Sequence, residues 1–262
     1  MGNCLEKDST TDKVTETLNA AFPGSLTGKS LASSVQKCLS AQGYKNETTL
    51  LAMSLCCDEV NRELESYFKE IYAENFSMGG LAGFPFGGVT SFGAMAHHIP
   101  EDGSCLVVYG PHVGIDLDGT VGKVNRRGRA ISGACCGSAT AAAAYVKGVS
   151  GGKIAPAAFP SDPLDAQQYF VGNMLLPHSS RLESASEVAV ELPLSLFDAQ
   201  NDFMKKIVDK ACGEVHGDDA KIALLGGIQI NTPEGYPEYF LPKVFEIYNN
   251  KGDKISDLLP SL

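Results

Sequence analysis

The chain has 262 residues, of which 44% are hydrophobic and 20% charged, with 31 acidic against 21 basic side chains. These proportions are typical of a folded domain with a sizeable core. The net charge of −10 and the lack of a Lys/Arg-rich run argue against a nucleic-acid partner, because binding phosphates requires a basic surface. No run approaches the roughly 20 apolar residues of a transmembrane helix, so we expect no membrane span.

The N-terminus carries an acidic, polar stretch where a signal peptide is apolar, and it lacks the Arg-rich character of a transit peptide. We therefore expect a cytoplasmic protein, although the sequence does not exclude a plastid. After removal of Met1, Gly2 would be open to myristoylation next to a palmitoylatable Cys4, but Glu6 departs from the Ser or Thr of that pattern. A lipid anchor at Gly2 and Cys4 is one alternative, and an ordinary N-terminus with an inert Cys4 is the other.

The first predicted elements are two helices within residues 12–43, separated by a break at Phe22-Pro23-Gly24. We assign residues 1–45 to an N-terminal helical segment. Residues 46–262 are assigned to a single compact α/β domain, because no repeat or linker divides them.

Short apolar runs in the rest of the chain predict buried strands over Thr48–Leu55, Cys105–Tyr109, Ile222–Ile230 and Val244–Tyr248. The stretches between them predict helices over Glu59–Tyr72, from Cys135-Cys136-Gly137 to about Lys147, and over Phe197–Cys212. A glycine-rich connection is expected over residues 79–93. Continuous apolar strands that alternate with helices indicate an α/β fold with a mostly parallel central sheet flanked by helices.

Candidate metal ligands lie where these strands end and where one helix begins. Cys56 ends the first strand, His112 follows the second, and Cys135 or Cys136 stands at a helix start. Ligand sites in open α/β sheets form beyond the carboxyl ends of the strands, so we expect these residues to meet. Two thiolates and one imidazole bind zinc and leave a fourth tetrahedral position for water, as in catalytic zinc sites. The alternative is core packing for the cysteines and a hydrogen-bonded loop for the histidine.

A carboxylate and an arginine follow the first candidate cysteine. Asp58 lies two residues after Cys56, and Arg62 follows Asp58 at the i, i+4 spacing of a helix. A carboxylate held ionised by Arg62 could accept a hydrogen bond from a zinc-bound water. The alternative is a helix cap with a surface ion pair, which contributes little to stability.

Four segments carry a family pattern: residues 54–62 (SLCCDEVNR), 110–114 (GPHVG), 132–137 (SGACCG) and 226–231 (GGIQIN). Together they resemble the limiting-CO2-inducible B/C protein family of algae and diatoms, also called theta-class carbonic anhydrases. The resemblance covers about residues 45–245. It implies a fold similar to β-class carbonic anhydrases, a homodimer, zinc held by Cys, His and Cys, and an Asp/Arg dyad.

On this sequence the resemblance implies Cys56, His112 and Cys136 as zinc ligands. Cys56 is preferred over Cys57 because one residue separates cysteine and aspartate in the β-class pattern. Cys136 is preferred over Cys135 because it directly precedes the glycine at the helix start.

The implied catalytic dyad is Asp58 with Arg62. The β-class pattern places arginine two residues after the aspartate, where this chain has Val60. An arginine of the 126–129 loop is therefore the other candidate partner for Asp58.

The resemblance implies zinc-dependent, reversible hydration of CO2 to bicarbonate. Two thiolates cancel the charge of Zn2+, so we expect a less acidic water and activity that rises at alkaline pH. CO2 carries no charge, so its pocket should be apolar. The candidate lining residues are Phe84, Phe86, Val89 and Phe92.

Two other functions remain open on the sequence. The first is a catalytically silent relative that binds zinc or bicarbonate and acts as a partner or scaffold in inorganic-carbon acquisition. The second is a hydrolase that uses Cys56 or Cys136 as nucleophile with His112 as base. It predicts activity that is insensitive to chelators, whereas a zinc thiolate should resist alkylation until the metal is removed.

Overall fold

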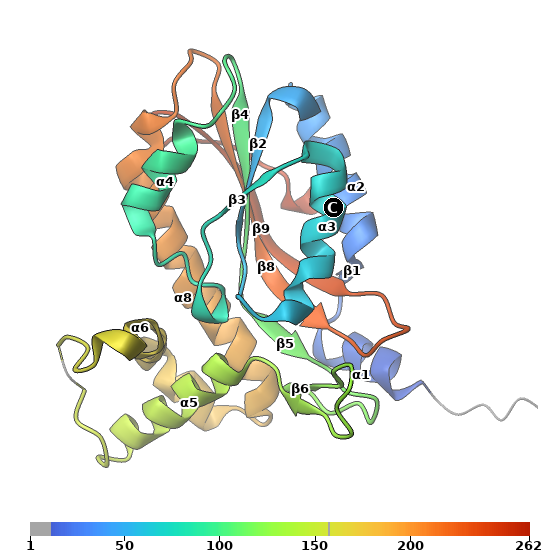
Figure 1. Ribbon diagram of the computed structural model, residues 1–262, viewed down its shortest axis with the longest axis vertical. Coiled ribbons are helices and arrows are strands. Elements are labelled where there is room, and N and C mark those ends of the chain that lie inside the picture. Colours follow the sequence, from blue (N-terminus) through green and yellow to red (C-terminus); the bar gives the residue numbers. More distant parts are fainter. Residues whose placement is uncertain (1–11, 157) are drawn as a thin grey trace, which may run out of the picture.

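The computed structural model describes residues 12–156 and 158–262. Eight strands form one central sheet in the order β1-β9-β8-β4-β2-β3, with β10 added to β9 and β5 added to β8 (Figure 1). The strands of this sheet are β1 (Leu26–Thr27), β2 (Thr49–Ser54), β3 (Asn75–Ser77), β4 (Ser104–Tyr109), β5 (His112–Gly114), β8 (Lys221–Asn231), β9 (Tyr239–Asn249) and β10 (Lys254–Asp257). A separate hairpin consists of β6 (Lys123–Val124) and β7 (Gly133–Ala134).

The middle of the sheet is parallel and one side of it is antiparallel. β3, β2, β4, β8 and β5 run parallel to their neighbours, whereas β9 is antiparallel to β8, and β1 and β10 are antiparallel to β9. The predicted α/β fold with a mostly parallel central sheet flanked by helices is confirmed.

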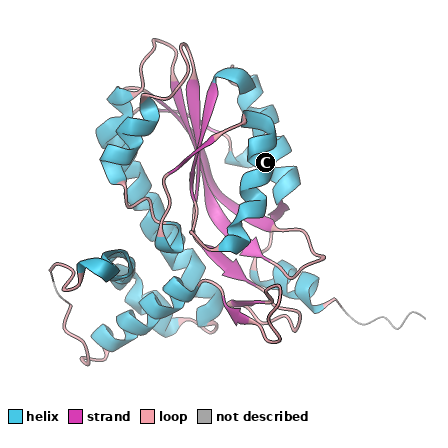
Figure 2. Ribbon diagram, in the orientation of Figure 1, coloured by secondary structure: helices cyan, strands magenta, loops and turns pink. Residues whose placement is uncertain are grey.

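Helices cover both faces of the sheet, with α2 and α3 on one face and α4 and α8 on the other (Figures 1 and 2). The helices are α1 (Lys13–Ala21), α2 (Gly28–Ala41), α3 (Arg62–Tyr72), α4 (Gly88–Ala96), α5 (Gly137–Ser150), α6 (Ala166–Leu175), α7 (Ser179–Ser184) and α8 (Val188–Ala211). Several helices differ from the sequence prediction. α4 begins inside the segment expected as a connection, α8 begins at Val188 rather than Phe197, and α6 and α7 are absent from the prediction.

The side chains of β4 show why its sequence is continuously apolar. Leu106 and Val108 pack in the core under α2 and α3, whereas Cys105, Val107 and Tyr109 pack in the core under α4 and α8. Both faces of the strand are therefore buried, as is typical of a parallel strand between two helical layers.

Helices α5, α6 and α7 form a third core cluster with the first half of α8, beyond one end of the sheet (Figure 1). Cys56 and Cys136 belong to this cluster. The junction between sheet and helical cluster therefore contains the residues that the sequence singled out.

No helix in the described ranges is long and apolar enough to cross a membrane. Gly2 and Cys4, the candidate lipid-anchor positions, lie outside the described residues.

Candidate metal centre

The structure brings Cys56, His112 and Cys136 together from three separate elements. Cys56 follows β2, His112 begins β5, and Cys136 is the residue immediately before α5. All three are at most 5% exposed, and their candidate ligand atoms lie within 4.8 Å of one another. The two sulfur atoms are 4.0 Å apart. Thiolates at 2.3 Å from a tetrahedral zinc would be about 3.8 Å apart, so this spacing suits zinc.

One nitrogen of the His112 imidazole has a hydrogen-bond partner, and the other has none among the described residues. Nδ1 lies 2.7 Å from the Oδ1 atom of Asn231. Nε2 is buried and has no hydrogen-bond partner among the described residues. A buried polar atom without a partner is costly, and a metal ion would satisfy it. Nε2 is therefore the atom of His112 that is available to a metal.

The neighbouring cysteines face different groups. Cys135 is buried, and its sulfur lies 3.4 Å from both His112 Nδ1 and Asn231 Oδ1. Together with His112 and Asp58 it forms a second group of possible ligands. Cys57 is exposed and belongs to neither group. Gly114 allows the close approach of Cys135 to β5, because a side chain there would lie only 2.9 Å from the Cys135 Cβ.

Asp58 is paired with Arg126 rather than with Arg62. An Nη2–Oδ2 distance of 2.6 Å joins Arg126 to Asp58. Arg62 instead binds Glu65 at 2.6 Å and donates a hydrogen bond of 2.7 Å to the Cys56 carbonyl. The expected Asp58–Arg62 pair is thus replaced by the loop arginine that the sequence left as the alternative. The reason is local: Asp58 has extended backbone angles and precedes a 3-10 turn over Glu59–Asn61, so helical i, i+4 geometry does not apply to it.

The surroundings of Asp58 favour its charged form. Partial burial raises the pKa of Asp58, but a hydrogen bond involving Glu59 and the charges of His112 and Arg126 outweigh burial and lower it overall. Asp58 is therefore a carboxylate at neutral pH, next to the candidate metal ligands.

The pKa values of the two facing thiols are shifted in opposite directions. Contact with Cys56, assisted by the backbone N–H groups of Ala139 and Ser138, lowers the pKa of Cys136 against the opposing effect of burial. The same contact and burial raise the pKa of Cys56 to about 12. Cys136 stands at the start of α5, where the helix dipole favours negative charge.

A small apolar cavity lies against this centre. Its volume is about 250 Å3, and it is lined by His112, Cys135 and Cys136 together with mostly apolar residues that include Val113, Ala139, Ala143, Leu192 and Pro193. None of the four residues expected to line a CO2 pocket lines this cavity. Phe84 belongs to the core cluster that also contains Cys56 and Cys136, and Phe86 packs against that cluster. Phe92 is buried in the core under α4 and α8, and Val89 is 43% exposed.

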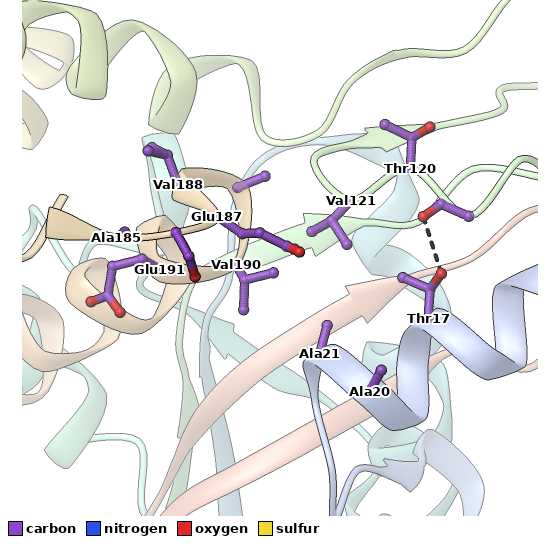
Figure 3. Close-up of a pocket in the computed structure, with 13 residues that line it drawn as sticks. Thr17, Ala20, Ala21, Thr120, Val121, Ala185, Glu187, Val188, Val190 and Glu191 are labelled. Atoms are coloured by element: carbon purple, nitrogen blue, oxygen red, sulfur yellow. Dashed lines mark hydrogen bonds between the residues drawn. The ribbon is translucent and has the colours of Figure 1, made fainter. Parts of the chain in front are cut away.

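A larger open groove adjoins the cavity. It lies between α1, the 119–121 loop and the start of α8, and it shares Val121, Val188 and Ala189 with the cavity (Figure 3). At one end of the groove Thr17 donates a 3.1 Å hydrogen bond to the Gly119 carbonyl, which ties α1 to the loop. The groove therefore gives the apolar cavity a side that is open to solvent.

Sequence reasoning missed a buried polar network behind His112. It consists of Asn61, Gln229, Asn231 and Glu238, all at most 6% exposed. The only signal in the sequence is polar residues at alternate positions of an otherwise apolar strand, in the segment GGIQIN.

The comparisons with known proteins agree with this geometry. The family model of limiting CO2-inducible proteins B/C beta carbonic anhydrases matches residues 25–249. The crystal structure of PtLCIB4, a homolog of the limiting CO2-inducible protein LCIB, is 47% identical over 94% of this chain and 100% of that chain, with a TM-score of 0.87. A histidine-to-alanine mutant of PtLCIB4 is 46% identical over 95% and 99% of the two chains, with a TM-score of 0.89. LCIB itself is 22% identical over 91% of this chain and 97% of that chain, with a TM-score of 0.70, and shares the fold. The search of curated proteins gave no match.

Proposed function

We propose that this chain, which belongs to the family of limiting CO2-inducible proteins B/C beta carbonic anhydrases, holds zinc with Cys56, His112 and Cys136 and catalyses the reversible hydration of CO2 to bicarbonate. The main support is that these three buried residues lie together and that one of their atoms, His112 Nε2, has no described hydrogen-bond partner. Zinc bound there would supply a Lewis acid that makes water nucleophilic enough to attack CO2.

In this proposal Asp58 orients the attacking water. Its Oδ2 atom is bound by Arg126, whereas its Oδ1 atom has a long, 3.5 Å contact with the backbone N–H of Val60 and keeps lone pairs for a further donor. Oδ1 can therefore accept a hydrogen bond from water and direct a lone pair of that water at the carbon of CO2. Arg126 keeps the carboxylate ionised and fixed.

The apolar cavity suits a small uncharged substrate. Its volume of about 250 Å3 is below the roughly 300–1,000 Å3 of pockets for drug-sized ligands. CO2 offers no charge for recognition, so contact with side chains such as Ala139 and Leu192 is the appropriate chemistry. The groove beside Ala189 would connect this cavity with solvent.

A second candidate function is a zinc-binding protein without activity that acts as a partner or scaffold in carbon acquisition. It is favoured by one observation: Asp58 also belongs to a possible ligand group with His112 and Cys135. If Asp58 occupied the fourth position around zinc, no position would remain for water.

The test is metal analysis combined with stopped-flow CO2 hydration on the zinc-loaded protein. Cys56→Ser should lose zinc and hydration together. The matched control, Cys57→Ser, changes the exposed neighbouring cysteine and should keep both. Wild-type protein that binds zinc but hydrates no CO2 would favour the silent relative. Activity that survives chelation but is abolished by alkylation would favour the cysteine-nucleophile hydrolase.

A further inference from the structure

The Nδ1 side of His112 faces an amide whose orientation is fixed by its surroundings. The Nδ2 group of Asn231 is near three acceptors: the Val60 carbonyl at 3.0 Å, Glu238 Oε1 at 3.1 Å and Asn61 Oδ1 at 3.3 Å. A side-chain amide has two N–H hydrogens on nitrogen and none on oxygen, so the nitrogen must point toward these acceptors. Asn231 therefore presents its oxygen, an acceptor, to His112.

This orientation determines which nitrogen of the imidazole carries hydrogen. Asn231 Oδ1 lies 2.7 Å from Nδ1 and can only accept, so Nδ1 must donate. In the neutral imidazole that binds a metal, the other nitrogen, Nε2, then has a free lone pair. It is the same atom that is buried without a described partner.

Glu238 is the carboxyl end of this chain of hydrogen bonds. Its Oε1 atom accepts from Asn231, and its Oε2 atom accepts from the Nε2 group of Gln229 at 2.6 Å. Among the described residues no basic side chain forms an ion pair with it. A buried carboxyl group without a cation partner is costly to the fold, which indicates that it is kept for another role.

We infer that Glu238 is a positioning residue of the metal centre: acting through Asn231, it holds His112 in the tautomer with hydrogen on Nδ1 and so leaves Nε2 to bind zinc. Metal-binding histidines usually donate their second nitrogen directly to a carboxylate or a carbonyl. Here an asparagine stands between the histidine and the carboxylate. The inference rests on the proposed zinc binding, but not on catalysis.

The same network reaches a second zinc ligand. Asn61, which accepts from Asn231, donates through its Nδ2 group to the Cys56 carbonyl at 3.3 Å. Changes at Glu238 should therefore loosen the zinc centre as a whole rather than a single side chain.

The experiment measures zinc affinity by competition with a chelator in the full-length protein. Glu238→Leu and Asn231→Ala should each weaken zinc binding by roughly 10- to 100-fold, the usual cost of removing such a partner. Glu238→Gln keeps an oxygen acceptor for Asn231, and the unpartnered Gln229 Oε1 can turn to accept from the new amide, so affinity should stay close to wild type. The matched control is Glu246→Leu, which removes another largely buried glutamate, within β9, and should leave zinc affinity unchanged.

A second readout is the 15N NMR spectrum of histidine-labelled, zinc-loaded protein, which reports the state of each imidazole nitrogen. The chain has five histidines, and the signal lost in His112→Gln identifies the relevant one. The wild-type protein should show hydrogen on Nδ1 and zinc on Nε2, and Asn231→Ala should show a mixture. This measurement on the wild type tests the inference even if the leucine variant does not fold.

The possible outcomes separate this inference from the proposed function. Wild-type zinc affinity in both Glu238→Leu and Asn231→Ala, or hydrogen on Nε2 in the wild type, would overturn the positioning role even in an active enzyme. Conversely, the expected affinities and NMR signals in a protein that hydrates no CO2 would support the positioning role and refute the proposed catalysis.

Discussion

The two sides of the His112 ring are built in opposite ways. On the sulfur side, which comprises Cys56 and Cys136, Nε2 has no described hydrogen-bond partner. On the amide side, which comprises the network of Asn61, Gln229, Asn231 and Glu238, Nδ1 is bound at 2.7 Å and the orientation of its partner is fixed.

This difference teaches how a site can be rigid and still open to a ligand. The amide side fixes the ring through hydrogen bonds that a metal does not disturb. The sulfur side keeps its lone pairs available, and the cavity beside it is mostly apolar. Preorganisation of this kind reduces the ordering that binding requires.

The largest effect on activity is expected from the carboxylate next to the sulfur side. Asp58→Asn should retain zinc but lower CO2 hydration about 100-fold, because the amide cannot accept and direct the hydrogen bond of water in the same way. Zinc content and stopped-flow rates measured together check this result. Glu59→Gln, which also changes a partner of Arg126, is the control, and its CO2 hydration rate should fall much less. Loss of zinc in Asp58→Asn would instead identify Asp58 as a metal ligand.

A change on the amide side should alter the pH dependence of stability. Burial raises the pKa of Glu238 to about 7, with the charge of Glu63 adding to burial while Gln229, Asn231 and His112 oppose it. Between pH 4.5, the ordinary pKa of this group, and pH 7, the folded state binds a proton that the unfolded state has lost. The wild-type free energy of unfolding therefore contains a contribution that is complete below this window and is lost as pH rises through it.

Glu238→Gln removes this titration. At equal metal content, the free energy of unfolding of the variant relative to wild type should rise by on the order of 2 kcal/mol from pH 4.5 to pH 7. Urea denaturation at several pH values measures the difference. A constant difference between the two proteins from pH 4.5 to pH 7 would show that Glu238 does not titrate in this range.

The two arginines near Asp58 provide a sharper test of the dyad. Arg126→Ala should lower CO2 hydration about 10-fold, because the carboxylate loses its charged partner in a partly buried site. Arg62→Ala removes a donor to the Cys56 carbonyl and a contact with Glu65, so its effect on hydration should be smaller. Rates measured at equal zinc content decide between them, and a larger loss in Arg62→Ala would return the dyad role to that residue.

The smallest effect is expected where the cavity meets the groove. Ala189→Phe should narrow the opening and lower the rate at low CO2 concentration by only a few-fold, because so small a molecule can pass a partial obstruction. Ala185→Phe changes a residue that lines the groove but not the cavity, and it should have no effect. Equal rates in both variants and the wild type would place the route of CO2 elsewhere.

Much of the sheet could be predicted because its central strands are buried on both faces. The predicted strands Thr48–Leu55, Cys105–Tyr109 and Ile222–Ile230 correspond to β2, β4 and β8. By contrast, α4 has the sequence GVTSFGAMA, whose glycine, threonine and serine residues are weak helix formers. Burial of Phe92, Met95 and Ala96 against the sheet stabilises this helix, and local sequence does not show that contact.

The candidate site shows the same division. Cys56, His112 and Cys136 could be singled out because each stands where an element ends or begins, so topology alone brings them to one end of the sheet. Whether they bind zinc stays a prediction. The partner of Asp58 could not be predicted, because the choice between Arg62 and Arg126 depends on a turn of a few residues.

The spacing of the three metal-site residues along the chain has a consequence for how metal and fold depend on each other. Positions 56, 112 and 136 are brought together only by the completed sheet and the start of α5. No short peptide cut from this protein contains the set, unlike a zinc finger, in which closely spaced residues fold locally around their ion. Cation uptake would therefore stabilise the sheet and the helical cluster together, and resistance to proteolysis would rise across both rather than in one segment.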